Sequence, residues 1–294
     1  MVDPALARER LIARLQVMAG AAMISFSAVF VKLAHVGPTT AGFYRVLFGG
    51  LVLAALVLIK GEPLWAGRRF FLTSILCGLM FALDLGFWHR SIHFIGPGLA
   101  TLLSNFQVFF LAAFGILVFK EKITWRLGLA IPLSMIGLYL VAGLNWNRLG
   151  KDYHWGVIFS LITAVCYAVY ILVLRWSRAH VQRLPVEAGL AIISFTTASI
   201  MGLFSVLTGE SLAIPDGQSW AALIGYGLFG QVFGWVFISK GLPRTASSQV
   251  GLFLLIQPTL AFIWDLLFFS RPTTAVEALG ACLALGAIYL GVTR

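Results

Sequence analysis

The chain has 294 residues, of which 60% are hydrophobic and only 11% are charged, and its mean hydropathy is +0.94. So few charges cannot cover the surface of a soluble domain of this length, which excludes a soluble protein and makes lipid the main solvent. The basic residues behind the formal net charge of +10 lie between long apolar segments and form no patch or stripe. Their distribution argues against a nucleic-acid partner and favours a role in membrane topology.

The first element is a charged segment with a helical pattern, residues 1–14, which we expect to lie in the cytoplasm. The apolar run that follows has full spanning length and no cleavage site, so we expect it to be retained. Cysteines fall only inside apolar runs, which argues against a disulfide framework. In chain order, the runs long enough to cross a bilayer are residues 15–34, 39–59, 70–88, 97–119, 125–143, 154–174, 186–207, 219–239, 246–269 and 274–292.

The basic residues fix the expected orientation, because loops rich in Lys and Arg stay in the cytoplasm. With the N-terminus inside, the residues on the outer side are few: Lys32, Arg90, Arg148, Lys151 and Arg271. Those on the cytoplasmic side are Arg8, Arg10, Arg14, Lys60, Arg68, Arg69, Lys120, Lys122, Arg126, Arg175, Arg178, Arg183, Lys240, Arg244 and Arg294. This asymmetry predicts a multi-pass membrane protein with both termini in the cytoplasm.

The sequence also predicts an internal repeat with an offset of 150 residues. This offset aligns Gln107 with Gln257 and Thr124 with Thr274, and it places five spans in each half, 15–145 and 154–294. Because five is odd, the second half must enter the membrane from the opposite side. The expected fold is therefore an all-α membrane protein with ten transmembrane helices in two inverted five-helix repeats, a plan typical of secondary transporters. The alternative is ten helices with chance similarity.

Three stretches resemble the drug/metabolite transporter superfamily, EamA type: "VFVKLAHVGPTTAGFYRVLFGGLVL" (29–53), "FGILVFKEKITWRLGLAIPLSMIGLYLV" (114–141) and "LLFFSRPTTAVEALGACLALGAIYLG" (266–291). The resemblance is greatest to the bacterial exporters of aromatic amino acids. It implies a carrier that moves small metabolites out of the cytoplasm, and it gives Glu121 a structural or gating role. The third stretch departs by having Ser270 where the family usually has the glutamate.

Charged residues at membrane depth are costly and are candidates for function. Arg45 and Asp84 lie at similar depths near the outer ends of consecutive spans, so they are expected either to form a structural ion pair or to line a substrate cavity. Trp88 and His89 lie at the outer mouth. Trp88 is typical of an interfacial aromatic belt, and His89 either is solvated or contacts substrate.

Amide side chains inside the spans need hydrogen-bond partners across helices or a wet cavity. Asn105 and Gln107 meet this description in the fourth span, and Gln249 and Gln257, eight residues apart, share one helical face of the ninth. Pro258 frees a backbone carbonyl near Gln257. Adhesion between helices and contact with a substrate are both compatible with this pattern.

Two pairs of residues place aromatic or amide groups on single helix faces. They are Tyr167 with Tyr170 and Gln231 with Trp235. Packing explains such a face, and so does stacking on a flat substrate ring. Lys240 closes its span at the cytoplasmic surface, where its side chain is expected to snorkel or to act in gating.

No metal-ligand spacing, nucleophile elbow or phosphate loop is present, so the sequence gives no indication of an enzyme, a metal site or a cofactor. The expected partners are a small-molecule substrate and the lipid bilayer, with no nucleic acid; the oligomeric state is open and a monomer is compatible with the sequence. We expect a secondary transporter that exports amino acids with aromatic side chains. The alternatives are an exporter or facilitator of other neutral or zwitterionic metabolites or drugs, an intramembrane enzyme, and a channel.

Overall fold

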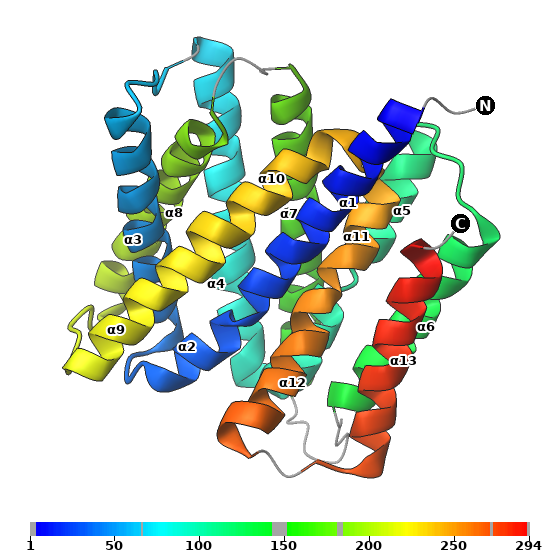
Figure 1. Cartoon of the computed structure of the whole chain (residues 1–294). Helices are drawn as coiled ribbons and strands as arrows, with labels where there is room; N and C mark the ends of the chain where they lie inside the picture. Colours follow the sequence, from blue (N-terminus) through cyan, green and yellow to red (C-terminus); the bar gives the residue numbers. More distant parts are fainter. Residues whose placement is uncertain (1–3, 66, 143–151, 181–184, 271–272, 293–294) are drawn as a thin grey trace.

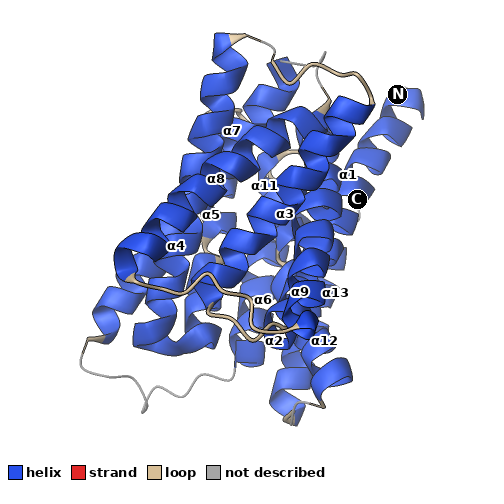
Figure 2. Cartoon of the chain, turned by 90° about the vertical axis from the view of Figure 1, so that its left-hand side faces the viewer, coloured by secondary structure: helices blue, strands red, loops and turns tan. Residues whose placement is uncertain are grey.

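The structure is a computed structural model that describes residues 4–65, 67–142, 152–180, 185–270 and 273–292. Every regular element in these ranges is a helix, and short loops join the helices (Figure 2). A helix satisfies its own backbone N–H and C=O groups, which a bilayer cannot do, so an apolar chain adopts this form. The predicted all-α class is confirmed for the described part of the chain.

Within the described ranges, eight helical stretches are long and apolar enough to cross a membrane, and two shorter apolar helices, Trp125–Val141 and Ala275–Gly291, accompany them. Each predicted apolar run falls on helix. The elements are α1 (Pro4–Ser25), α2 (Ser27–Leu33), α3 (Pro38–Ile59), α4 (Arg68–Ser104), α5 (Gln107–Leu117), α6 (Trp125–Ala142), α7 (Tyr153–His180), α8 (Val186–Thr208), α9 (Gly217–Tyr226), the π-helix η2 (Gly227–Gly234), α10 (Trp235–Gly241), the 3₁₀ turn η3 (Leu242–Arg244), α11 (Ser247–Leu254), α12 (Ile256–Phe269) and α13 (Ala275–Val292).

The main departure from the predicted spans is the segment 89–96, which was expected as a loop and is helical within α4. The chain still reverses direction after it. Ile95 lies against Gly156 at the start of α7, whereas Glu121 bonds to Arg175 near the other end of α7. The predicted runs 70–88 and 97–119, which lie on either side of this segment, are therefore antiparallel, as the sequence predicted.

Ion pairs lie at the end of the bundle where α1 begins, α3 ends and α4 begins. We call it the basic end. The chain termini lie toward this end in Figure 1. The pairs are Lys60–Glu187 at 3.4 Å, Arg244–Glu9 at 3.3 Å and Arg175–Glu121 at 3.2 Å. The described basic residues expected in the cytoplasm thus share one end of the bundle.

The opposite end, which we call the far end, is held by the loop between α8 and α9. Asp216 caps α9 by accepting the backbone N–H of Ser219 at 2.7 Å, and it contacts the His35 ring at 2.8 Å. These hydrogen bonds, from the Ser219 backbone and then from His35, hold the pKa of Asp216 below its ordinary value. Tyr44 and Thr40, at the start of α3, donate to backbone carbonyls of the same loop. The loop is therefore fixed to the segment that follows α2 and to α3.

Helices cross closely where glycine is present, as is common in membranes. A Cβ atom added to Gly137 of α6 would lie 2.6 Å from the carbonyl oxygen of Gly280 in α13. On α1, a Cβ atom on Gly20 would meet Ile238 of α10 at 2.7 Å. Figure 1 shows α6 beside α13 and α1 beside α10. These contacts bring backbones together and leave no space for a side chain between them.

Local features recur in the two halves with the predicted offset of 150 residues. Lys120 and Ser270 both have positive φ, at 53° and 49°. Thr124 and Thr274 each use the side-chain oxygen to accept the backbone N–H three residues later, at 3.3 and 3.2 Å. The helices α6 and α13 begin directly after these caps. The halves thus share backbone detail beyond their weak sequence similarity.

This correspondence corrects one detail of the resemblance to the transporter superfamily. Because Ser270 matches Lys120 in backbone conformation, the position that matches Glu121 is Arg271 and not Ser270. Arg271 lies outside the described residues. The two halves therefore carry opposite charges at this position of the sequence.

The tight crossing of α6 and α13 is testable. Gly137→Ala should destabilise the detergent-solubilised protein by about 1–3 kcal/mol, because the methyl group would overlap the backbone of α13. Gly286→Ala is the matched control, since an added Cβ there meets no atom within 4 Å, and it should be neutral or slightly stabilising. Thermal unfolding measures both, and an equal effect of the two substitutions would contradict the crossing.

Candidate functional site

Four rings pack together near the middle of the bundle. The Trp235 indole at the start of α10 lies 4.8 Å from the ring of Tyr170 and 5.7 Å from that of Phe81, both edge-on, and 6.1 Å from Tyr167. Phe81 and Tyr170 stack on one another at 5.1 Å. Trp235, Tyr170 and Phe81 are almost fully buried. The predicted aromatic pair of α7 and the predicted tryptophan are thus brought together by the fold.

Arg45 of α3 lies beside these rings and is only 6% exposed. Its guanidinium lies 5.1 Å from the centre of the Tyr226 ring and 5.6 Å from that of Phe81. It donates to the Tyr226 hydroxyl and to the carbonyl of Gly230, both at 3.4 Å. A Cβ atom at Gly230 would lie 3.2 Å from Nε of Arg45, so glycine allows the arginine to approach this backbone. Ring faces and a carbonyl therefore compensate the buried charge.

The expected ion pair between Arg45 and Asp84 is absent, and that prediction was wrong as a direct contact. No oxygen of Asp84 lies within 4.0 Å of the guanidinium, because Arg45 points toward α9 and η2. Asp84 is itself buried in α4, where the hydroxyl of Thr163 donates to its backbone carbonyl at 3.3 Å. Arg45 still acts on the Asp84 carboxyl electrostatically. The two opposite charges thus lie near each other without neutralising each other directly.

Gln231 reaches this region from the π-helix η2. Its amide nitrogen donates to the Ser194 hydroxyl of α8 at 2.8 Å, and its side chain packs on Gly49 of α3. We call Arg45, Phe81, Asp84, Tyr167, Tyr170, Gln231 and Trp235 the central cluster. Its members come from α3, α4, α7, η2 and α10 and lie near the middle of their spans.

Buried polar atoms without a hydrogen-bond partner occur in several parts of the described chain, for example the hydroxyl groups of Ser134 and Ser205, and several belong to the central cluster. Those of the cluster are Nε of Arg45, the hydroxyl of Tyr170, Oε1 of Gln231 and Nε1 of Trp235. Nε2 of Gln257, next to Tyr167, is a further one. Proteins hydrogen-bond nearly all of their buried polar atoms, and lipid provides no partner. The central cluster is therefore suited to receive a polar ligand.

The two helix interruptions explain the positions of the predicted amides. Asn105 ends α4 and donates to the carbonyl of Thr101 at 2.8 Å, so it bonds within its own helix and not across helices as expected. Gln107 begins α5, is buried, and has an unpartnered Oε1. Gln257 and Pro258 lie in the first turn of α12, where proline costs little. Both deep glutamines thus follow a break in a helix.

Gln249 and Gln257 lie on different helices, because the ninth predicted span is interrupted at Leu255 between α11 and α12. Gln249 lies in the first turn of α11 at the basic end, away from the central cluster. The shared face of the two glutamines stays a prediction, and their different depths separate their environments.

Trp88 and His89 lie in α4, between the central cluster and the far end. Trp88 packs against the hydrophobic core. The His89 ring lies 3.5 Å from the Thr39 hydroxyl at the start of α3 and next to Gly42. The structure therefore places both residues on the side from which the far end is reached and does not join them to the central cluster.

A second polar constellation lies at the basic end around Glu121. Its carboxylate accepts the backbone N–H groups of Ser247 at 2.8 Å and Ser248 at 3.2 Å, which begin α11, and the Ser248 hydroxyl at 3.0 Å. Arg175 of α7 completes the set at 3.2 Å and also bonds to the Ser247 hydroxyl. A carboxylate at a helix N-terminus is favoured by the exposed N–H groups and the helix dipole. Glu121 thus links the first half of the chain to the second.

Sequence reasoning missed several of these partners. Arg175 was counted only as a topology signal, and Ser194, Tyr226 and Ser248 gave no signal, because hydroxyl groups are common in helices that pack closely. Lys240, predicted to snorkel or gate, is exposed in the last turn of α10. The charge of Lys240 acts on Glu187 of α8.

Comparison with known proteins matches the EamA-like transporter family twice, over residues 11–143 and 154–293. The chain belongs to the EamA-like transporter family. The two matched stretches correspond to the two predicted halves of the chain.

Individual relatives are distant. A WAT1-related chloroplastic protein of Arabidopsis thaliana is 23% identical over 92% of this chain, and a "Probable amino-acid metabolite efflux pump" of Salmonella typhimurium is 22% identical over 92%. The alignments span 66% of the Arabidopsis protein and 90% of the Salmonella protein. An uncharacterised transporter of Archaeoglobus fulgidus is 21% identical, over 58% of each chain. The chain thus spans less than two thirds of two of these relatives.

A crystal structure of a protein that is 19% identical superimposes with a TM-score of 0.81, covering 95% of this chain and 97% of the other. At this identity the likeness shows a shared fold.

The Glu121 constellation yields a stability prediction. Glu121→Ala should destabilise the protein by about 2–5 kcal/mol, because it leaves the N–H groups of α11 and the Arg175 guanidinium without their acceptor. Glu9→Ala is the control, since the Glu9–Arg244 pair is exposed and should contribute less than about 1 kcal/mol. Thermal unfolding in detergent should separate the two variants, and similar losses would show that Glu121 is an ordinary surface ion pair.

Proposed function

We propose that the protein is a secondary transporter that exports small metabolites, with a preference for amino acids that have aromatic side chains, and that substrate binds at the central cluster. The observation that carries the proposal is the group of unpartnered polar atoms among buried rings at mid-depth. Rings alone would be ordinary core packing. Rings with Arg45, Asp84 and free amide and hydroxyl groups match a substrate that has an aromatic part and a charged part.

Each part of such a substrate has a complementary group. The ring would stack against Trp235 and the α7 tyrosines, where aromatic pairs gain energy beyond area burial. The carboxylate would be attracted to Arg45, whose Nε has no hydrogen-bond partner among the described residues. The ammonium group would face Asp84, and Gln231 and Gln257 would bond to the head group. The absence of a direct Arg45–Asp84 pair supports this assignment, because both charges remain available.

We place ten crossings in the membrane, with the two shorter apolar helices as the fifth and tenth, in two inverted halves of five. Three observations support this arrangement of two inverted halves. They are the odd number of predicted spans per half, the backbone features repeated 150 residues apart, and the two matches to the family. The basic end would face the cytoplasm of a bacterial cell, since positive segments are retained there. Export then runs from the basic end to the far end.

Transport would proceed by alternating access, in which one half moves against the other around a fixed central site. In this structure the rings of the central cluster pack on one another, so a ligand enters only when helices separate. Glu121 closes the basic end by joining the segment after α5 to α7 and α11. Opening toward the cytoplasm would break these hydrogen bonds. The far end would open instead at the loop that binds α2 and α3.

Aromatic selectivity gives the first functional prediction. Trp235→Ala and Tyr167→Ala should reduce transport of ring-bearing amino acids roughly two- to tenfold more than that of small ones, because stacking contributes about 0.5–1.5 kcal/mol. Gln257→Leu should reduce transport of all amino acids alike, since an amide would bind the shared head group. Competition uptake into liposomes containing the purified protein measures both.

Trp235→Phe is the control for folding, because it keeps a ring in the core and should retain most of the selectivity. Equal losses for ring-bearing and small substrates in the alanine variants, at unchanged protein levels, would remove the case for aromatic selectivity. They would leave a general metabolite exporter.

The orientation is tested by two matched cysteine substitutions in a cysteine-free background. Ala213→Cys lies exposed in the loop between α8 and α9, and Ala179→Cys lies exposed near the end of α7. A membrane-impermeant maleimide added to intact cells should label position 213 and miss position 179 until the membrane is opened. The reverse pattern would overturn both the cytoplasmic assignment of the basic end and the direction of export.

A further inference from the structure

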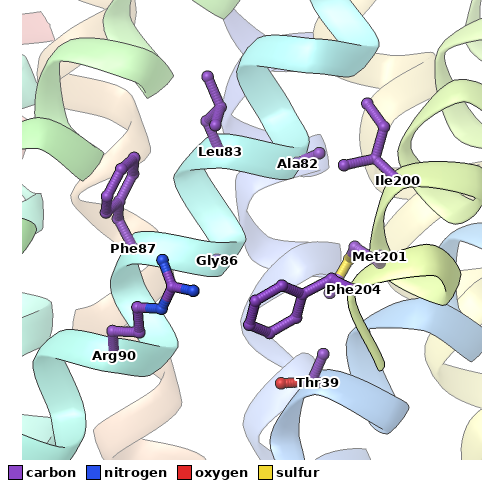
Figure 3. Close-up of a pocket in the computed structure, with 9 residues that line it drawn as sticks. All are labelled: Thr39, Ala82, Leu83, Gly86, Phe87, Arg90, Ile200, Met201 and Phe204. Carbon is purple, nitrogen blue, oxygen red and sulfur yellow. The ribbon is translucent and has the colours of Figure 1, made fainter. Parts of the chain in front are cut away.

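A hollow of about 110 Å³ lies between α4 and α8, close to the start of α3, and is separate from the central cluster (Figure 3). Its walls are mostly apolar: Leu83 and Phe87 of α4 and Ile200 and Phe204 of α8. The polar lining residues are Arg90 and Thr39.

The hollow lies on a different face of α4 from the central cluster. Ala82, Gly86 and Arg90 line it and follow one another at the four-residue spacing that marks a single helix face. Phe81 and Asp84 point elsewhere, because each residue advances the helix by about 100°. Ligand contacts in this hollow are therefore independent of the proposed substrate site.

Gly86 forms the floor of the hollow. A Cβ atom added there would meet no atom within 4 Å, whereas Gly137 and Gly20 are needed for close helix crossings. Glycine inside a helix costs about 1 kcal/mol relative to alanine. No helix uses the space that Gly86 leaves, so this glycine preserves the volume of the hollow.

Arg90 lies at one edge of the hollow, next to Phe87 and Phe204 (Figure 3). Its guanidinium is 4.9 Å from the centre of the Phe204 ring. None of the described carboxylates lies within 4.0 Å of it, so its charge is available to a ligand. Arginine presents a planar fork of donors that fits phosphate oxygens. Arg90 is close to the far end of its span, the depth at which lipid headgroups begin.

We propose that this hollow binds a phospholipid of the surrounding bilayer, with the phosphate on Arg90 and the first methylene groups of an acyl chain above Gly86. The positive charge of Arg90 complements the phosphate, and the apolar walls accommodate the acyl chain. A polar substrate on its way out would find no polar group inside the hollow apart from the Thr39 hydroxyl. The lipid would join α4 to α8 and stabilise this pair of helices from the leaflet at the far end.

The test uses the full-length protein purified in detergent, with phosphatidylglycerol added back in steps. Native mass spectrometry counts bound lipids, and thermal unfolding measures the stabilisation. Arg90→Gln should lose one tightly bound lipid and most of the rise in melting temperature at low lipid concentration. Gly86→Leu should do the same by filling the hollow, without removing charge.

Two matched controls separate the site from general effects of charge or size. Arg69→Gln removes an exposed arginine that also lies over a ring, 4.8 Å from Trp176, at the basic end and away from the hollow. Gly286→Leu fills open space on α13. Both should bind lipid like the wild type. If Gly86→Leu fails to fold, the comparison of Arg90→Gln with Arg69→Gln is sufficient to test the proposal.

Wild-type lipid binding in Arg90→Gln and in Gly86→Leu would overturn the proposal. Equal stabilisation of the wild type by inorganic phosphate would also overturn it, because the apolar half of the site would then contribute nothing. Protection by amino acids that is lost in both variants would instead make the hollow part of the transport path. Each result is independent of whether the central cluster binds aromatic amino acids.

Discussion

A bilayer cannot hydrogen-bond to the chain, so every polar group at mid-depth needs a partner in the protein or in a ligand. Helices meet this need for the backbone, and glycine crossings such as Gly137 with Gly280 hold the helices together without polar contacts. Arg45 meets it with ring faces and the Gly230 carbonyl. Among the described residues the requirement is left unmet at several hydroxyl groups and also at Tyr170 and Trp235, which contact one another. The constraint that dictates the fold is thus also the reason for proposing the central cluster as the site.

Much of this architecture was predictable from the sequence, because hydropathy and basic residues report directly on contact with lipid. The spans, their antiparallel order and the gathering of basic residues at one end all follow from these two signals. Contacts between helices far apart in sequence leave no such trace. The sequence placed Arg45 and Asp84 at similar depths but could not show that Arg45 turns toward Tyr226. It also could not show the break at Leu255, which divides the ninth span into α11 and α12.

The two halves share helix breaks, caps and a residue with positive φ at equivalent positions, yet their polar contacts differ. Glu121 holds the start of α11 in one half, and the equivalent position of the other half is Arg271. If the two halves made identical contacts, closure of the basic end and closure of the far end would be equally stable. Here the Glu121 carboxylate and Arg175 close the basic end, whereas the far end is closed by the exposed Asp216–His35 contact and by hydroxyl groups of α3 that donate to loop carbonyls. The backbones of the two halves are thus alike, whereas the contacts that close the two ends of the bundle differ.

The π-helix at Gly227–Gly234 holds an extra residue relative to regular α-helical winding. Deleting that residue would let the segment wind as an ordinary α-helix, and the residues beyond it would keep nearly the same faces, because the wide turns absorb the rotation of the extra residue. Trp235 would then still meet the rings of α4 and α7. A deletion in the regular α-helix of α10 would instead turn every later residue by about 100°. The π-helix is thus the part of this span whose length can change without rotating the residues that follow it.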